Sequence, residues 1–341
     1  MRQKQTKNIL TIGDGIAAWC LHEELLKLDN VKIVNMSAEA QFPACSLRST
    51  SINCLRGTRP GVSALGDLIL KSYQKFEVYY KENSPAGIHP SIEYQTWNDV
   101  AKWKRRYSSW YDVEDKEFLS SKIQGQNFYQ YNDAYFLEPR EMKNWYRKRH
   151  GAIEFKEELV KEISDSKKVF TEAAEYKFDI IIMATGYASA TLGKGYNEKF
   201  DYYLDHCKPV AGTYLEIDIK ETDLNFDSSF NLAIGPNHFI YRKEQGVIQI
   251  GSTNDNRSDD HRPNINGVKQ IYNYLSETLI FDLPDFQEFR KITGIRHKGF
   301  ERMPYWGEIA TNIYAISGLY KNAYTFAYQA ASDIKKSIES K

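Results

Sequence analysis

The sequence lacks three features that would place it in a specialised class of protein. It has no excess charge, because 45 lysines and arginines face 45 aspartates and glutamates, so composition alone gives no reason to expect nucleic acid or an anionic membrane as a partner. No segment approaches the roughly 18 apolar residues of a membrane span. Its four cysteines form no C-x-x-C pair and no Cys/His cluster: Cys20, Cys45, Cys54 and Cys207.

The cysteine pattern predicts no metal site and no disulfide framework, and it favours a reducing, cytoplasmic setting. The first 21 residues have a basic head and an apolar run, as a signal peptide does. Asp14 interrupts that run, and the glycines beside it have a better explanation, so we expect no secretion.

The chain is long and rich in aromatic residues. Its 341 residues exceed the usual size of one domain, which predicts two domains or one with an insert. Aromatic residues make up 14% of the sequence, and four of the six tryptophans fall between residues 97 and 145. That stretch shows no sustained period, so residues 90–140 are predicted to form short strands and loops.

The beginning of the chain has the pattern of a βαβ unit. Residues 8–12 are predicted to form a buried strand, residues 16–28 a helix and residues 31–35 a second strand. The pattern Gly13-x-Gly15-x-x-Ala18 joins the first strand to the helix. There the glycines permit a tight turn and let a pyrophosphate approach the positive end of the helix.

Further elements follow along the chain. Helices are expected at 63–82, from Pro139 towards Gly151, and at 323–338. The continuously apolar residues 178–183 predict a buried parallel strand. Alternating residues predict antiparallel strands within 210–219 and 237–252, and a last strand is expected at 312–317.

Seven ordered landmarks together resemble the D-amino-acid-oxidase-like family of FAD-dependent oxidoreductases, of the glycine oxidase and sarcosine oxidase type. Each is weak alone, and their order along nearly the whole chain carries the resemblance. They are residues 12–26, Cys45-Ser46-Leu47-Arg48-Ser49-Thr50, residues 179–189, Pro209-Val210-Ala211-Gly212-Thr213, Ile250-Gly251-Ser252-Thr253, Gly294-Ile295-Arg296 with Pro304 and Gly307, and Gly318-Leu319-Tyr320-Lys321-Asn322.

The resemblance implies an α/β protein with a discontinuous Rossmann-like FAD-binding domain and an inserted, mainly antiparallel substrate domain. We expect the FAD-binding domain at 1–75, 150–205 and 290–341, and the substrate domain at 76–149 and 206–289. It implies FAD, held non-covalently. The cofactor-binding residues that it implies are Gly13, Gly15, Ile16, Ala17, Asn35, Ser46, Arg48, Ser49, Thr50, Val160, Ala184, Thr185, Gly186, Gly318, Lys321 and Asn322.

Departures from the family pattern also stand in the sequence. The acid expected at the end of the second strand is replaced by Asn35, which still offers a carbonyl to a ribose hydroxyl or serves as a plain turn residue. Ser51 and Ala323 stand where relatives have glycines. These replacements keep open a catalytically silent dinucleotide-binding protein.

The substrate residues that the resemblance implies are Arg296 and Tyr241. Arg296 would hold a carboxylate through two parallel hydrogen bonds, and Tyr241 would add a hydroxyl. The expected reaction is oxidation of a C–N bond in a small amino acid or N-substituted glycine. Oxidation of a carboxymethylaminomethyl group on a tRNA wobble uridine, or of a 2-hydroxy acid, is the alternative chemistry.

The sequence also contains two segments in which aromatic and basic residues alternate, Trp103–Tyr107 and Trp145–His150. Such segments can stack bases and hold phosphates. With a neutral chain, an exposed helix whose basic side chains cover packed aromatics is the more economical interpretation, so a small-molecule partner is favoured over tRNA. The oligomeric state has no signature here.

Overall fold

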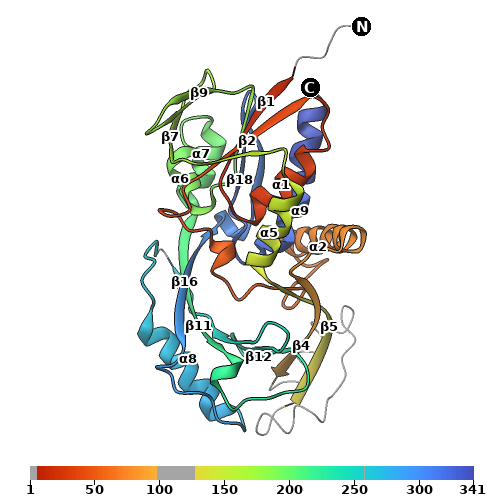
Figure 1. The fold of residues 1–341 in the computed structure, drawn as a ribbon, viewed down its shortest axis with the longest axis vertical. Helices are drawn as coiled ribbons and strands as arrows, with labels where there is room; N and C mark the ends of the chain where they lie inside the picture. The colour runs from red at the N-terminus through yellow and green to blue at the C-terminus, as the bar shows by residue number, and fades with distance from the viewer. Residues whose placement is uncertain (1–5, 98–126, 257) are drawn as a thin grey trace.

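A computed structural model describes residues 6–97, 127–256 and 258–341 (Figure 1). Within these ranges the chain forms a six-stranded sheet, a nine-stranded sheet and a small three-stranded sheet. In Figure 1 the six-stranded sheet occupies the upper half and the nine-stranded sheet the lower half. The mixed α/β architecture expected from the sequence is confirmed.

The six-stranded sheet is the Rossmann-like part. Its strand order is β17-β18-β10-β1-β2-β6, and all neighbours are parallel except β17 and β18. The strands are β1 (Lys7–Ile12), β2 (Val31–Ser37), β6 (Glu154–Glu157), β10 (Ile180–Met183), β17 (Tyr305–Ala310) and β18 (Ile313–Ser317).

The inner strands β10 and β18 are buried along their whole length, because both faces of the sheet are covered there. One face, with Ile9 and Ile180, packs against helices α1 (Ile16–Leu25), α2 (Ala64–Asn83), α5 (Pro139–Arg149) and α9 (Ala323–Glu339). The other face, with Leu10 and Ile181, packs against α7 (Glu198–His206) and the three-stranded sheet. That small sheet contains β7 (Val160–Ile163), β8 (Lys168–Thr171) and β9 (Glu175–Lys177).

The nine-stranded sheet is mainly antiparallel, and β12 and β4 are a parallel pair within it. One of its faces packs against α8 (Ile265–Thr278) around Leu215, Phe239 and Val268. Its strands are β3 (Ile52–Cys54), β4 (Ile88–Trp97), β5 (Asn127–Leu137), β11 (Lys208–Asp218), β12 (Phe230–Ile234), β13 (Asn237–Arg242), β14 (Val247–Gly251), β15 (Asp255–Asn256) and β16 (Arg290–Lys298).

Most predicted elements are confirmed, with differences at two places. Helix α1 ends at Leu25 rather than at residue 28, because residues 26–28 form a turn before β2. Within 90–140 the chain forms much of the long strands β4 and β5, where short strands and loops were expected. Tertiary pairing between these strands provides the regularity that their residue pattern does not show.

Strand pairing crosses the predicted domain boundaries twice. Strands β3 and β16 lie in ranges assigned to the FAD-binding domain, yet β3 pairs with β5 and β16 with β11 in the nine-stranded sheet. The division into domains stays a prediction. In the described part of the chain, no helix is long and apolar enough to cross a bilayer.

Candidate functional site

A cavity of about 1110 Å³ extends from the glycine turn after β1 to the nine-stranded sheet. Its walls come from the beginning, middle and end of the chain. The predicted site residues that line it are Gly13, Gly15, Ile16, Ala17, Ser46, Arg48, Ser49, Thr50, Val160, Ala184, Thr185, Gly186, Arg296, Gly318, Lys321 and Asn322. Asn35 and Tyr241 are not part of its lining.

The glycine turn has the geometry that a dinucleotide requires. Gly13 has a φ of +118°, and a Cβ there would lie 2.4 Å from the carbonyl oxygen of Ala184. A Cβ on Gly15 would lie 3.3 Å from Ser46 Oγ. Only glycine therefore fits at Gly13, and the bare backbone leaves the N-terminus of α1 open to the cavity.

The residue between the two glycines is an acid whose charge is neutralised. Asp14 Oδ2 accepts hydrogen bonds from Lys143 Nζ at 2.6 Å and from an Arg147 Nη at 2.9 Å, both on α5. The indole N–H of Trp19 donates to Asp14 Oδ1 at 3.1 Å. These contacts balance the negative charge of the carboxylate close to the N-terminus of α1, where an anion is favoured. Sequence analysis did not identify this group, although the basic residues of α5 stood out there.

Asn35 supports the glycine turn instead of facing the cavity. Its amide nitrogen donates to the carbonyl oxygen of Gly13 at 2.8 Å and to Thr11 Oγ1 at 3.1 Å, and its side chain is fully buried. The expectation that it presents a carbonyl to a ribose is corrected, because β2 continues to Ser37 and carries Asn35 into the sheet. Ser37 and Glu39 line the cavity at this edge.

The loop that contains Arg48, Ser49 and Thr50 is held by a buried arginine that the sequence did not reveal. Arg242 on β13 donates to the carbonyl oxygens of Thr50 at 2.5 Å and of Leu137 at 2.9 Å. Burial lowers the pKa of Arg242 to about 10. The guanidinium therefore joins the loop to β5 and sets the cavity wall between the two sheets.

Arg296 lies in the cavity with its guanidinium directed across β11. It donates to the carbonyl oxygen of Thr253 at 3.0 Å, and no acid lies within ion-pair distance of it among the described residues. A Cβ on Gly212 would lie 1.6 Å from Arg296 Nη2. Because Gly212 has no side chain, there is room for the guanidinium of Arg296 over β11.

Tyr241 points to the opposite face of its strand, which corrects the sequence expectation. It is buried between β13 and α8, against Phe226 and Phe230, and its hydroxyl accepts a hydrogen bond from the backbone N–H of Phe226 at 3.2 Å. Because side chains alternate along a strand, the cavity face of β13 instead carries His238, which lines the cavity.

His297 follows Arg296 and connects three segments of the wall. Its Nδ1 lies 3.0 Å from Ser317 Oγ at the end of β18, and it makes a hydrogen bond to the backbone of Gly186. Burial lowers its pKa to about 4, so the imidazole is neutral at physiological pH.

The last turn before α9 places Lys321 in the cavity. Burial and the nearby charges of Arg296 and Arg56 together lower the pKa of Lys321 to about 8. This lysine is therefore close to the pH at which it loses its charge.

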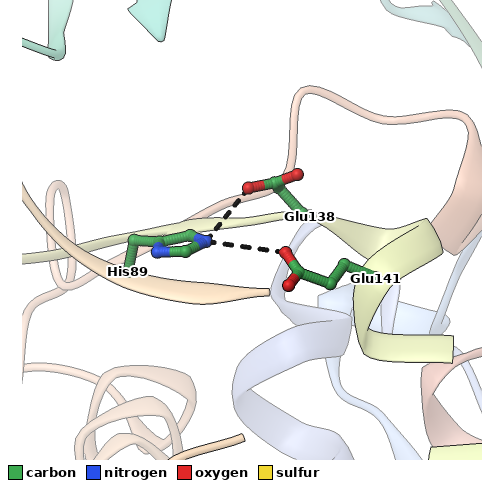
Figure 2. Close-up of side chains that lie close together, drawn as sticks. All are labelled: His89, Glu138 and Glu141. Carbon is green, nitrogen blue, oxygen red and sulfur yellow. Dashed lines mark ion pairs between the residues drawn. The ribbon is translucent and has the colours of Figure 1, made fainter. Parts of the chain in front are cut away.

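A separate His/Glu group lies outside the cavity lining. His89 on β4 is 3.0 Å from Glu138 and 3.9 Å from Glu141 at the N-terminus of α5 (Figure 2). Among the described residues it is the group whose ligand atoms lie close enough to hold a metal ion. The three side chains are part-exposed and form an ordinary ion-pair cluster.

The structure describes only the second of the two basic-aromatic segments. Residues 103–107 lie outside the described residues. In α5, Arg147 pairs with Asp14, while Arg149 and His150 both pair with Glu23. Three basic residues of this segment are thus paired with acids of the protein, while Lys148 and Arg149 stay exposed.

Comparisons with known proteins agree with this arrangement. A family model described as FAD dependent oxidoreductase (DAO) matches residues 12–334. Glycine oxidase from Geobacillus kaustophilus superposes with a TM-score of 0.76 at 16% identity, covering 97% of this chain and 95% of its own. Iminodiacetate oxidase from a Chelativorans species superposes with a TM-score of 0.75 at 12% identity, covering 98% and 95%. A search of curated proteins found no match.

Proposed function

The chain belongs to the DAO family of FAD-dependent oxidoreductases, and on this premise we propose that it oxidises a C–N bond in a small amino acid or N-substituted glycine. The cofactor is FAD, and the glycine turn fits its pyrophosphate because the tight turn at Gly13, where a Cβ would collide with the carbonyl oxygen of Ala184, leaves the backbone at the N-terminus of α1 bare. The observation that carries the substrate proposal is Arg296, a cavity-lining guanidinium with no acidic partner among the described residues.

In this proposal the chain's own residues bind and orient the substrate. Arg296 holds the carboxylate in two parallel hydrogen bonds, which fixes the adjacent carbon. Bound FAD would supply a hydride acceptor at N5 for the carbon beside nitrogen, and oxygen or another acceptor would reoxidise it. The C=N bond of the oxidised substrate would then be hydrolysed by water to a carbonyl and an amine.

We further propose that FAD is held without a covalent bond and that the protein acts in the cytoplasm. Three cysteines line the cavity, Cys45, Cys54 and Cys207. Burial raises the pKa of Cys45 to about 11 and raises the pKa values of the other two thiols as well. A protonated thiol is a poor nucleophile, which supports non-covalent binding.

The test is an anaerobic screen of amines, amino acids and 2-hydroxy acids that follows loss of flavin absorbance. Bleaching by an amine supports the proposal. Bleaching by hydroxy acids alone replaces it with the dehydrogenase alternative, and no bleaching at all favours the catalytically silent one. tRNA oxidation is tested by binding bulk tRNA at two salt concentrations, where absence of binding at low salt eliminates it.

Arg296→Met should raise the KM of a carboxylate-bearing amine at least tenfold, because the variant loses a charge-assisted fork worth about 1.5–3 kcal/mol. Gly212→Ala should act in the same direction without removing the arginine, since its Cβ displaces the guanidinium. Gly151→Ala is the control, with its nearest atom 4.0 Å away. An unchanged KM in both site variants would remove Arg296 from the substrate site.

A further inference from the structure

The end of the cavity beneath the nine-stranded sheet carries more positive than negative charge. Three of the cations in the cavity lining, Arg56, Arg296 and Lys321, lie near one another, because the charges of both arginines lower the pKa of Lys321. Arg56 is paired with an acid, since it forms an ion pair with the fully buried Glu93.

The two remaining cations are Arg296 and Lys321. Neither has an acidic side chain within ion-pair distance in the described part of the chain, and Arg296 donates to one backbone carbonyl, that of Thr253. Tyr320 lies beside both, with the Arg296 guanidinium 5.9 Å and Lys321 Nζ 5.7 Å from its ring centre. Burial and the surrounding cations lower the pKa of Lys321 to about 8. Like charges so placed are stabilised when an anion lies between them.

Arg56 is fixed at the other side of this cavity end by neutral groups as well as by Glu93. An Arg56 Nη lies 2.7 Å from His238 Nε2, and His238 Nδ1 lies 3.1 Å from Asn231 Oδ1. An arginine only donates, so Nε2 accepts and the proton of the neutral imidazole is on Nδ1. Burial, Arg56 and Lys321 lower the pKa of His238 well below its usual value, which keeps the ring neutral.

The two arginine side chains lie against different strands of the sheet. The Arg296 guanidinium lies over Gly212 on β11, whereas Arg56 contacts His238 on β13, and β14 lies between these strands. Two strand spacings separate β11 from β13 by about 10 Å. One carboxylate with hydrogen bonds of about 2.8 Å does not span that distance, while a ligand with two acidic groups does.

We propose that the substrate carries a second acidic group, so that one carboxylate lies on Arg296 and the other on Lys321 and Arg56. This inference rests on the proposed function and narrows its substrate class to diacidic amines, such as an N-substituted glycine whose substituent ends in a carboxylate. In such a ligand the two acids neutralise the two remaining positive charges, and the nitrogen between them stays free to react.

The test compares ligands that differ by one carboxylate. Succinate and butyrate do not react as amines, so their binding to the FAD-loaded protein is measured by the change in the flavin absorption spectrum and by thermal stabilisation. Succinate should bind at least tenfold more tightly. Equal binding overturns the proposal, and the surplus charge would then serve the reduced flavin anion.

The matched amines are iminodiacetate and sarcosine, both N-substituted glycines. Iminodiacetate should bleach the flavin with the lower apparent KM. If sarcosine reacts as well as iminodiacetate, the diacid proposal is wrong and the proposed function stands. If succinate binds preferentially but no amine bleaches the flavin, the proposed function fails and the diacid site stands.

Two variants locate the second acid. Lys321→Met should reduce the preference for succinate over butyrate by about tenfold, measured on protein fully loaded with FAD. Arg56→Lys keeps a positive charge beside Glu93 but loses the two parallel hydrogen bonds that a guanidinium can donate. It should therefore reduce the preference for succinate by a smaller factor without unfolding the protein. Lys199→Met, at an exposed lysine of α7, is the control. If both site variants keep the full preference for succinate over butyrate, the second carboxylate does not lie on Lys321 and Arg56.

Discussion

His297 shows how a single buried residue makes the stability of the cavity wall depend on pH. Its imidazole joins β16 to Ser317 and to the backbone of Gly186. Burial lowers its pKa from 6.5 to about 4. The folded protein therefore keeps this ring neutral over a pH range in which the unfolded chain binds a proton.

The stability contributed by neutral His297 should be fully present above pH 6.5 and should be lost as the pH falls towards 4. Over this window the free energy of unfolding should decrease by roughly 3 kcal/mol, at 1.36 kcal/mol per pKa unit. Urea unfolding of the FAD-loaded protein at several pH values between 7 and 4 measures this decrease in the free energy of unfolding.

In His297→Asn the dependence should be shallower, since the variant has no group at this position that gains a proton. His206→Asn is the matched control, at an exposed histidine that ends α7. If the variant His297→Asn keeps the slope of the natural protein, the titration belongs to another group.

Of the two predicted substrate residues, Arg296 lines the cavity and Tyr241 does not. Arg296 was found from the G-x-R pattern and lies in the cavity. Tyr241 was assigned to the wrong face of β13, because the apolar run of that strand gives no sign of which face meets α8 and which meets the cavity. His238, three residues earlier, could have been found only from strand pairing.

At the scale of an element, α5 acts as a support for the glycine turn. Lys143 and Arg147, one helical turn apart, both reach Asp14, and Lys143 also pairs with Glu39 at 2.5 Å. Two acids at the cavity are thereby neutralised by two cations on one helix face. This arrangement lets an acid lie next to the helix end that is expected to receive a pyrophosphate.

Lys143→Met should weaken FAD binding by about tenfold, or 1.4 kcal/mol, because part of the negative charge of Asp14 and Glu39 is then left unbalanced near the phosphates. Titration of the apoprotein with FAD, followed by fluorescence quenching, measures the affinity. Lys148→Met on the same helix is the control, because Lys148 is exposed.

A second substitution separates charge from structure. Adding Asp14→Gly to Lys143→Met removes most of the unbalanced charge and should restore much of the affinity. If the double variant binds FAD no better than Lys143→Met, the lysine acts through the packing of α5 and not through charge. The sequence showed the basic residues of α5, but it could not show that their partners lie more than 100 residues away.

At the scale of the whole molecule, the cavity lies where the two sheets meet, and its walls belong to both. The glycine turn comes from the six-stranded sheet, Arg296 and His238 from the nine-stranded sheet, and Lys321 from the turn before α9. A ligand that fills the cavity therefore contacts both sheets at once.

FAD should consequently stabilise both sheets together. At a concentration 100 times its Kd, a ligand that binds only the folded state adds about 2.7 kcal/mol, which for a chain of this size corresponds to a rise in Tm of several degrees. Thermal unfolding followed by circular dichroism, with and without FAD, measures this shift. Two separate transitions, only one of which responds to FAD, would show that the sheets are stabilised independently.

The sequence predicted the parts of the fold that local patterns determine. The βαβ opening, β10, β18 and α9 follow from apolar runs and glycine turns, and the structure confirms them. The pairing of β3 and β16 with the nine-stranded sheet, and the roles of Arg242 and Asp14, depend on contacts between distant segments. A residue pattern read along one segment contains no information about such partners.

The contribution of residues 318–322 to the cavity also has a consequence for biosynthesis. A nascent polypeptide in which this turn is still within the ribosome has the glycine turn of residues 13–15 already outside, but lacks one wall of the cavity. Tight capture of the flavin nucleotide should therefore follow translation of residues 318–322, and chains arrested before residue 318 should remain colourless.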